Sequence, residues 1–143
     1  MRVESSVLIN RPLEEVFAFA GDFANDPQWL LPVIESMPTS NNPIGVGKTY
    51  KRTAKLMGMT MSETAEVTEY DPGKKSCFKS TSGPIPNTNC RTFASESSGT
   101  RVTLVLEATP TGFFKLMQPM LASTMNKAES NLAMLKRLLE AKS

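Results

Sequence analysis

Two charged residues, Arg52 and Glu63, lie at positions where a strand-like alternation otherwise carries mainly apolar side chains. The segments Thr49–Leu56 and Met59–Tyr70 are predicted to form a hairpin about Met57-Gly58. In a regular hairpin the numbers of paired residues sum to 115, which places Arg52 opposite Glu63. Because an unpaired buried charge costs several kcal/mol, each residue must meet an opposite charge or reach water in a cavity.

Three interpretations of this pair stay open. Arg52 can anchor the carboxylate or carbonyl group of a ligand, and Glu63 can act as an acid or base if burial raises its pKa. With Tyr50 on the same strand face, Arg52 and Glu63 form the candidate catalytic set. The third interpretation, which we favour, is a structural ion pair or a different strand register. The same alternatives apply to Arg91.

The chain of 143 residues contains no histidine. This absence excludes Ser-His and Cys-His nucleophile pairs, the usual imidazole base, and most zinc and non-haem iron sites. Carboxylates, Tyr, Lys and Arg remain, so acid–base chemistry of a lyase or cyclase is open to the chain, whereas hydrolysis by a catalytic triad is not. We expect neither a metal nor an organic cofactor.

Length, charge and cysteine content limit the class of protein. One domain over residues 1–143 is expected, and a net charge of only +2 with scattered Lys and Arg argues against a nucleic-acid partner. No signal-peptide core and no membrane-length apolar run is present, so we expect a cytoplasmic protein without stable membrane insertion. Cys77 and Cys90 fit no metal spacing and are predicted to be reduced thiols. A homodimer is compatible with the sequence.

The elements that must position these side chains begin with a strand at Val3–Ile9 and a short helix over residues 12–21. Asn25 or Asp26 is predicted to cap a second short helix, with Pro27 at its first position. The remaining strands are predicted at Val33–Met37, Thr49–Leu56, Met59–Tyr70, Ser76–Ser82, Cys90–Glu96 and Arg101–Ala108. This order of elements predicts an α+β arrangement with consecutive antiparallel strands.

The segment Gly112–Lys142 has apolar residues at helical spacing, which predicts a long amphipathic helix. Its apolar stripe consists of Phe114, Met117, Leu121, Met125, Ala128, Leu132, Leu135 and Leu139. Pro119 removes one backbone hydrogen bond, so we expect a kink between Lys115 and Pro119. A helix of this length needs a broad surface to cover, and the predicted strands can supply it.

A set of turn, cap and core motifs extends along the whole chain. These motifs are Val7-Leu8-Ile9-Asn10-Arg11-Pro12, Glu15-Val16-Phe17, Asp22-Phe23-Ala24-Asn25-Asp26-Pro27-Gln28-Trp29, Gly45-Val46-Gly47, Val67-Thr68-Glu69-Tyr70-Asp71-Pro72, Gly99-Thr100-Arg101-Val102-Thr103 and Gly112-Phe113-Phe114. In them the chain resembles the START/SRPBCC superfamily, the helix-grip fold of polyketide cyclase/dehydrase-like proteins and the major birch pollen allergen. The resemblance implies a seven-stranded antiparallel sheet wrapped around the C-terminal helix, with two short helices after the first strand.

The resemblance also implies a cavity between the sheet and the helices. Members of the superfamily bind lipids, sterols, polyketides, plant hormones, quinones or other apolar molecules there, and some catalyse aromatisation or cyclisation. The expected function is therefore binding or carriage of a small hydrophobic ligand such as a lipid, polyketide or quinone. A cyclase, aromatase or dehydratase that uses Glu63, Arg52 and Tyr50 is one alternative, and a protein-interaction module is another, because a shared fold does not choose among them.

The lining of such a cavity is expected to come from inward-facing residues. From the sheet the candidates are Tyr50, Arg52, Met59, Met61, Glu63, Phe78, Ser80, Phe93, Leu104 and Leu106, and from the helices they are Trp29, Phe113, Met117, Met120 and Leu121. These positions also suit ordinary core residues. The methionines, which are Met57, Met59, Met61, Met117, Met120 and Met125, either line an adaptable cavity or fill gaps in the core.

The start of the predicted C-terminal helix allows a different role. Phe113, Phe114 and Leu116 are clustered in sequence. If these side chains stay exposed, they can contact a membrane or a partner protein.

Overall fold

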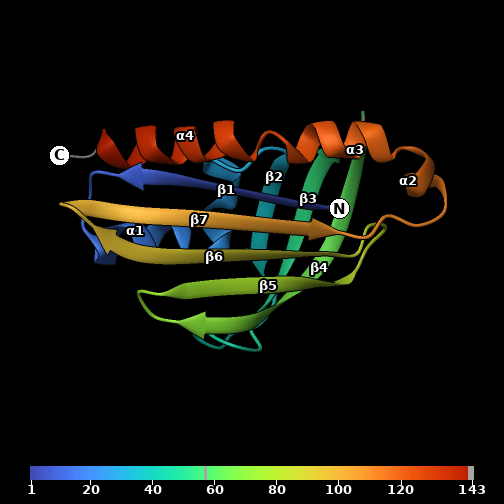
Figure 1. Cartoon of the computed structure of the whole chain (residues 1–143). Helices are drawn as coiled ribbons and strands as arrows, with labels where there is room; N and C mark the ends of the chain where they lie inside the picture. Colours follow the sequence, from blue (N-terminus) through green and yellow to red (C-terminus); the bar gives the residue numbers. More distant parts are fainter. Residues whose placement is uncertain (57, 142–143) are drawn as a thin grey trace.

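The computed structural model describes residues 1–56 and 58–141, arranged as in Figure 1. Seven strands in this described part form one antiparallel sheet in the order β1-β7-β6-β5-β4-β3-β2. The strands are β1 (Arg2–Ile9), β2 (Val33–Pro38), β3 (Thr49–Leu56), β4 (Met59–Asp71), β5 (Lys75–Ser82), β6 (Asn87–Glu96) and β7 (Gly99–Ala108). In Figure 1 β2, β3 and the first part of β4 run across the direction of β1, β5, β6 and β7, and the end of β4 turns to run along β5, so the sheet is strongly curved. The predicted α+β class and seven-stranded antiparallel sheet are confirmed.

The helices lie between the first two strands and after the last. They are α1 (Leu13–Ala20), the 3-10 helix η1 (Phe23–Gln28), α2 (Phe113–Leu116), α3 (Gln118–Met125) and α4 (Ala128–Glu140). In Figure 1 α3 and α4 extend along one side of the sheet beside β1. Leu132, Leu135 and Leu139 of α4 are buried in one core cluster with Ile9 of β1 and Leu104 of β7.

The C-terminal segment is not one continuous helix, so that prediction is wrong in part. The first break, at Met117, lies within the predicted kink, and Pro119 stands in the first turn of α3. The second break, at residues 126–127, was not predicted: the Lys127 N–H bonds to Thr124 O three residues back, which tightens the chain as α3 ends. Buried residues continue through both helices at Leu121, Met125, Ala128, Leu132, Leu135 and Leu139. The predicted end at Lys142 lies outside the described residues.

The second short helix begins earlier than predicted, and its cap is a different residue. The side chain of Asp22 accepts a hydrogen bond from Ala24 N at 3.0 Å, which caps η1. Pro27 lies inside this helix rather than at its first position. Asn25 instead donates its side-chain amide to Phe19 O, and Asp26 points into the interior with no exposed surface.

The hairpin between β3 and β4 has the predicted register. Arg52 pairs with Glu63, and the residue numbers of every pair along the hairpin sum to 115. Met57 in the turn lies outside the described residues. The next turn, Asp71 to Lys74, has Gly73 at φ 77° and a hydrogen bond from Lys74 N to Asp71 O, as a type II turn requires.

Cys77 and Cys90 form a disulfide, so the prediction of two reduced thiols is wrong. The two residues are direct partners on the antiparallel strands β5 and β6, with their Cα atoms 4.2 Å apart. Strand register thus brings into contact two thiols that are 13 residues apart in sequence.

Among the described residues, no helix is both long and apolar enough to cross a membrane. The cytoplasmic location stays a prediction.

Candidate functional site

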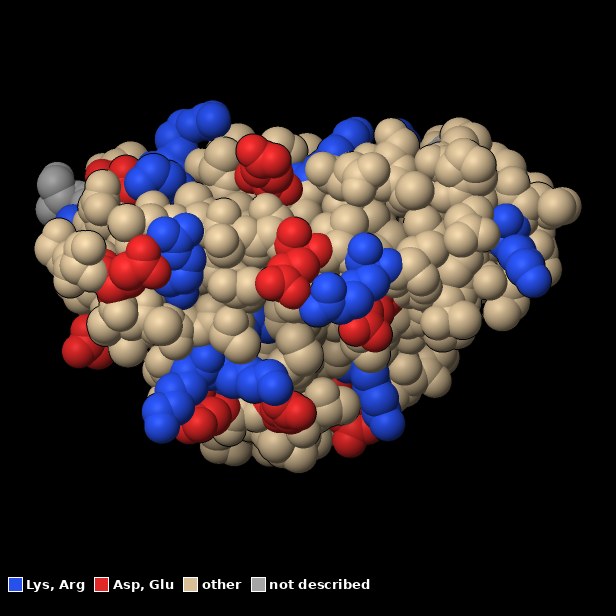
Figure 2. All heavy atoms as spheres, in the orientation of Figure 1, with Lys and Arg blue, Asp and Glu red and all other residues tan. Residues whose placement is uncertain are grey.

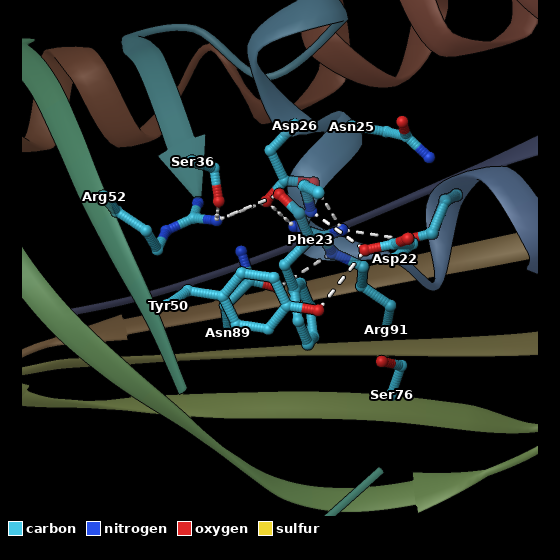
Figure 3. Close-up of polar contacts among 12 residues, drawn as sticks. Asp22, Phe23, Asn25, Asp26, Ser36, Tyr50, Arg52, Ser76, Asn89 and Arg91 are labelled. Carbon is cyan, nitrogen blue, oxygen red and sulfur yellow. Dashed lines mark hydrogen bonds and ion pairs between the residues drawn. The ribbon is translucent and has the colours of Figure 1, made fainter. Parts of the chain in front are cut away.

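A buried cluster of charges lies where η1 faces the inner side of the sheet (Figure 3). Asp26 of η1 accepts two hydrogen bonds from Arg91 of β6, from Nη1 at 2.8 Å and from Nη2 at 2.6 Å. The same carboxylate lies 2.9 Å from Nη1 of Arg52 on β3. Asp26 and Arg91 have no exposed surface, and Arg52 is 4% exposed. One carboxylate therefore holds two guanidinium groups that come from separate strands.

Further contacts fix the two guanidinium groups. Arg91 donates to Ala20 O at 2.8 Å and to Asn89 Oδ1 at 3.1 Å, and it stacks over the rings of Phe23 and Trp29. Hydrogen bonds to backbone carbonyls and stacking on aromatic faces suit the planar guanidinium. Arg91 is thus fully engaged in structural contacts.

Arg52 is less completely satisfied than Arg91. Its Nη1 donates to Ser36 Oγ at 3.1 Å, and its guanidinium lies 4.5 Å from the ring centroid of Phe78. Its Nε lies 3.7 Å from Glu63 Oε2, which is too long for a good hydrogen bond. Among the described residues, no acceptor is hydrogen-bonded to this buried Nε. A strong donor is therefore left without an acceptor beside Glu63.

Glu63 occupies the boundary between this charge cluster and the loop before β6. Asn87 donates its side-chain amide to Glu63 Oε1 at 2.7 Å and to Ile85 O at 2.8 Å. Burial raises the pKa of Glu63, and the opposing effects of the Asn87 hydrogen bond and the Arg52 charge are smaller. The structure thus confirms the spacing of the predicted pair and adds a second polar partner.

Replacing Glu63 by glutamine is expected to remove one part of the pH dependence of stability. Because the pKa of Glu63 is raised above its ordinary value of 4.5, the folded state holds this proton more tightly than the unfolded chain. The resulting stability is fully present below that value and is lost as pH rises through the raised pKa. In urea denaturation across this range, the unfolding free energy of the wild type should fall relative to that of Glu63→Gln. If the unfolding free energies of the wild type and Glu63→Gln change in parallel with pH, the pKa of Glu63 is not raised in the folded state.

Tyr50 takes a structural position apart from this pair. Its hydroxyl donates to Asp22 Oδ1 at 3.3 Å, and its ring packs edge-on against Phe23. Burial, assisted by the charge of Asp22, raises the pKa of Tyr50 far above its usual range. The residue is a neutral hydrogen-bond donor between β3 and the start of η1.

A cavity of about 160 Å³ lies next to Arg52 and Glu63. Its polar lining includes Arg52, Glu63, Asn87, Asn89 and Asn131. Its apolar lining includes Leu30, Val33, Ala54, Leu56, Met61, Phe78, Ile85, Leu106, Leu121 and Met125. A largely apolar concave wall with a few convergent polar groups is the usual form of a small-molecule site.

The loop between β5 and β6 closes one side of the cavity. Pro84 and Ile85 line it, and Asn87 ties Ile85 to Glu63. Gly83 has φ 127°, and a Cβ at this position would lie 2.8 Å from Glu63 Cβ. Gly83 therefore allows the loop backbone to lie directly against Glu63.

The structure brings only part of the predicted lining together. The predicted residues that do line the cavity are Arg52, Met61, Glu63, Phe78, Leu106 and Leu121. Three others, Trp29, Phe93 and Leu104, lie in the core cluster that includes α4, and Tyr50 lies in a second cluster with Phe23. The predicted residues that lie on the surface or near it are Met59, Phe113, Met117 and Met120. Ser80 accepts a hydrogen bond from Asn87 N.

Sequence reasoning missed the asparagines and Asp26. Asn87 and Asn89 share a strand face with Arg91, but β6 begins at Asn87 rather than at the predicted Cys90. Extending the alternation of Arg91 backwards by two and four residues would have found both. Asn131 donates to Leu31 O and accepts from Leu31 N, which joins α4 to the segment after η1. Nothing in the sequence pattern pointed to Asp26 as a buried partner of two arginines.

The charged side chains form neither a one-sign patch on the visible face nor a metal-binding group among the described residues. Figure 2 shows Lys and Arg interspersed with Asp and Glu over the visible face, without a patch of one sign. Within residues 1–56 and 58–141, no group of three or more His, Cys, Asp or Glu residues could hold a metal ion.

Comparison with solved structures supports the fold. A protein of Thermus thermophilus is 25% identical, with a TM-score of 0.83 over 100% of this chain and 99% of that chain. The Zhui aromatase/cyclase of Streptomyces sp. R1128 is 11% identical, with a TM-score of 0.77 over 98% and 93%. A START superfamily protein of Mycobacterium smegmatis is 14% identical, with a TM-score of 0.76 over 99% of both chains.

The sequence itself gives a family assignment. A comparison with curated proteins finds no match. The family model described as "Polyketide cyclase / dehydrase and lipid transport" matches residues 1–140, which confirms the resemblance to START/SRPBCC proteins. The chain therefore belongs to the polyketide cyclase/dehydrase and lipid transport family.

Proposed function

We propose that the protein binds a small, largely apolar molecule that carries an oxygen acceptor, with the acceptor placed at Arg52. Two observations carry this proposal: Arg52 lines an otherwise mostly apolar cavity, and its buried Nε has no hydrogen-bonded acceptor in the part of the chain that the structure describes. A buried donor without a partner costs free energy, and a ligand oxygen would remove that cost. Metal or cofactor chemistry has no part in this proposal.

Cavity size limits the ligand. An apolar cavity of about 150 Å³ is known to accept benzene, and this cavity measures about 160 Å³. A single ring with a short substituent fits that space. A one-ring compound is therefore the appropriate first probe.

An enzymatic function is the second candidate, favoured by Glu63. A carboxyl whose pKa is raised by burial, beside an arginine in a cavity wall, suits proton transfer to or from a bound carbonyl compound. One structural relative is an aromatase/cyclase. In this version of the function, Glu63 moves the proton and Arg52 stabilises the oxyanion that forms. Tyr50 is left out because it does not line the cavity.

The interaction module remains a weaker proposal. Phe113 is 57% exposed and Leu116 is 82% exposed. In Figure 2 the end of the molecule where α2 lies is mostly uncharged. Exposed apolar residues favour contact with another surface, but they do not explain the unpaired donor inside.

A comparison of two ring compounds tests the proposed binding. Acetophenone and ethylbenzene are similar in shape, but only acetophenone has a carbonyl oxygen. Because a hydrogen bond to a charged group contributes about 1.5–3 kcal/mol, acetophenone should bind roughly 10- to 150-fold more tightly in calorimetric titrations. If the two compounds bind with equal affinity, Arg52 does not anchor the ligand. If neither compound binds, the cavity is not the binding site.

A further inference from the structure

The charges around Arg52 balance only when Glu63 is ionised. Arg52 and Arg91 carry two positive charges, and the carboxylates of Asp26 and Glu63 carry two negative charges. Asp26 makes two short hydrogen bonds with Arg91. The charge that compensates Arg52 is therefore shared between one oxygen of Asp26 and the loosely paired Glu63.

A ligand carboxylate at Arg52 Nε would bring a further negative charge close to Glu63. The Glu63 side chain is 20% exposed, so the site is largely shielded from water. Two carboxylates that share such a site do not both stay ionised, so one of them must hold a proton. The ligand carboxylate would accept a hydrogen bond from Arg52, which favours its ionised form. Burial, in contrast, already disfavours the ionised form of Glu63. The proton therefore belongs on Glu63.

Among the described residues, the titratable groups other than Glu63 that lie near the cavity are less well placed to take that proton. Facing Glu63 are Arg52 from β3 and the uncharged Asn87 from β6, with Asp26 of η1 behind Arg52. Glu107 of β7 lines the cavity, but it is exposed and lies 3.5 Å from Arg2. The lining residues from α3 and α4 within the described chain are uncharged.

We infer that the cavity accepts ring-sized carboxylic acids as their anions, and that each anion binds together with one proton, which goes to Glu63. This inference rests on the proposed function and names a ligand class for the same site. The proton comes from solvent or from the acid itself, so the buried cluster gains no net charge. Neutral Glu63 keeps its carbonyl acceptor for Asn87 and can donate its O–H to the ligand carboxylate.

Calorimetric titration with benzoate tests this linkage. Benzoate stays ionised at pH 7 and 8, so any proton taken up on binding goes to the protein. Titrations in two buffers of different ionisation enthalpy should give an uptake that approaches one proton per benzoate at pH 8. The affinity should fall by up to about tenfold per pH unit over this range.

Two variants test whether Glu63 is the residue that takes up the proton. Glu63→Gln should bind benzoate at both pH values without proton uptake and with a nearly constant affinity. Glu66→Gln, on the opposite face of the same strand, should keep the proton uptake of the wild type. Benzoate binding without proton uptake in the wild type, or unchanged uptake in Glu63→Gln, would overturn the inference.

The neutral probe distinguishes the two levels of the proposal. If acetophenone binds and benzoate does not, the acid-binding inference is wrong and the proposed cavity function stands. If neither compound binds, both are wrong.

Discussion

Asp26→Asn is expected to lower the free energy of unfolding by about 3–5 kcal/mol, which is the usual cost of removing one partner from a buried ion pair. Asp26 is fully buried and is the carboxylate that Arg52 and Arg91 share. Asparagine keeps the shape of the side chain but leaves both guanidinium groups without their common counter-charge. Urea denaturation at neutral pH measures the change.

Asp71→Asn is the matched control for this prediction. Asp71 is exposed, and the turn that follows it uses its backbone carbonyl. The same chemical change there should alter the unfolding free energy by no more than about 0.5 kcal/mol. A loss of under about 1 kcal/mol in Asp26→Asn would mean that the cluster does not hold η1 against the sheet as described.

The charged hairpin pair could be predicted because its geometry is local. A short turn determines the register of β3 and β4, so the turn and the strand alternation together place Arg52 opposite Glu63. The apolar stripe of the C-terminal segment could be predicted for the same reason, and its spacing survives two breaks in the helix. Local periodicity therefore placed Arg52, Glu63, Leu121 and Met125, which line the cavity together with residues from other elements.

The rest of the site depends on contacts between distant segments. Asp26 and Arg91 are 65 residues apart, and Asn131 and Leu31 are 100 residues apart. Alternation shows which face of a strand a residue occupies, but it does not show which helix lies above it. For this reason Trp29, Phe93 and Leu104 were predicted to line a cavity, although they pack against α4 and its neighbours instead.

Ala54→Phe is expected to abolish binding of acetophenone. Ala54 lies on β3 two residues after Arg52, on the same face, and lines the cavity. The added phenyl ring has the size of benzene, which by itself fills a cavity of about 150 Å³. The ring should occupy the space that the ligand needs, at a stability cost of about 1–3 kcal/mol from overpacking.

Ala133→Phe provides the matched control, because Ala133 is exposed on α4 and does not line the cavity. Near-ultraviolet circular dichroism and thermal melting should show that both variants are folded. Leu121→Phe, from the opposite wall of the cavity, is the second filling variant if Ala54→Phe proves unstable.

Calorimetric titration of acetophenone into the wild type, Ala54→Phe and Ala133→Phe tests most directly whether the cavity is the binding site. The wild type and Ala133→Phe should bind one molecule with the same affinity, and Ala54→Phe should show no detectable binding. If folded Ala54→Phe binds acetophenone within about twofold of the wild-type affinity, the ligand lies elsewhere and the proposed site is wrong.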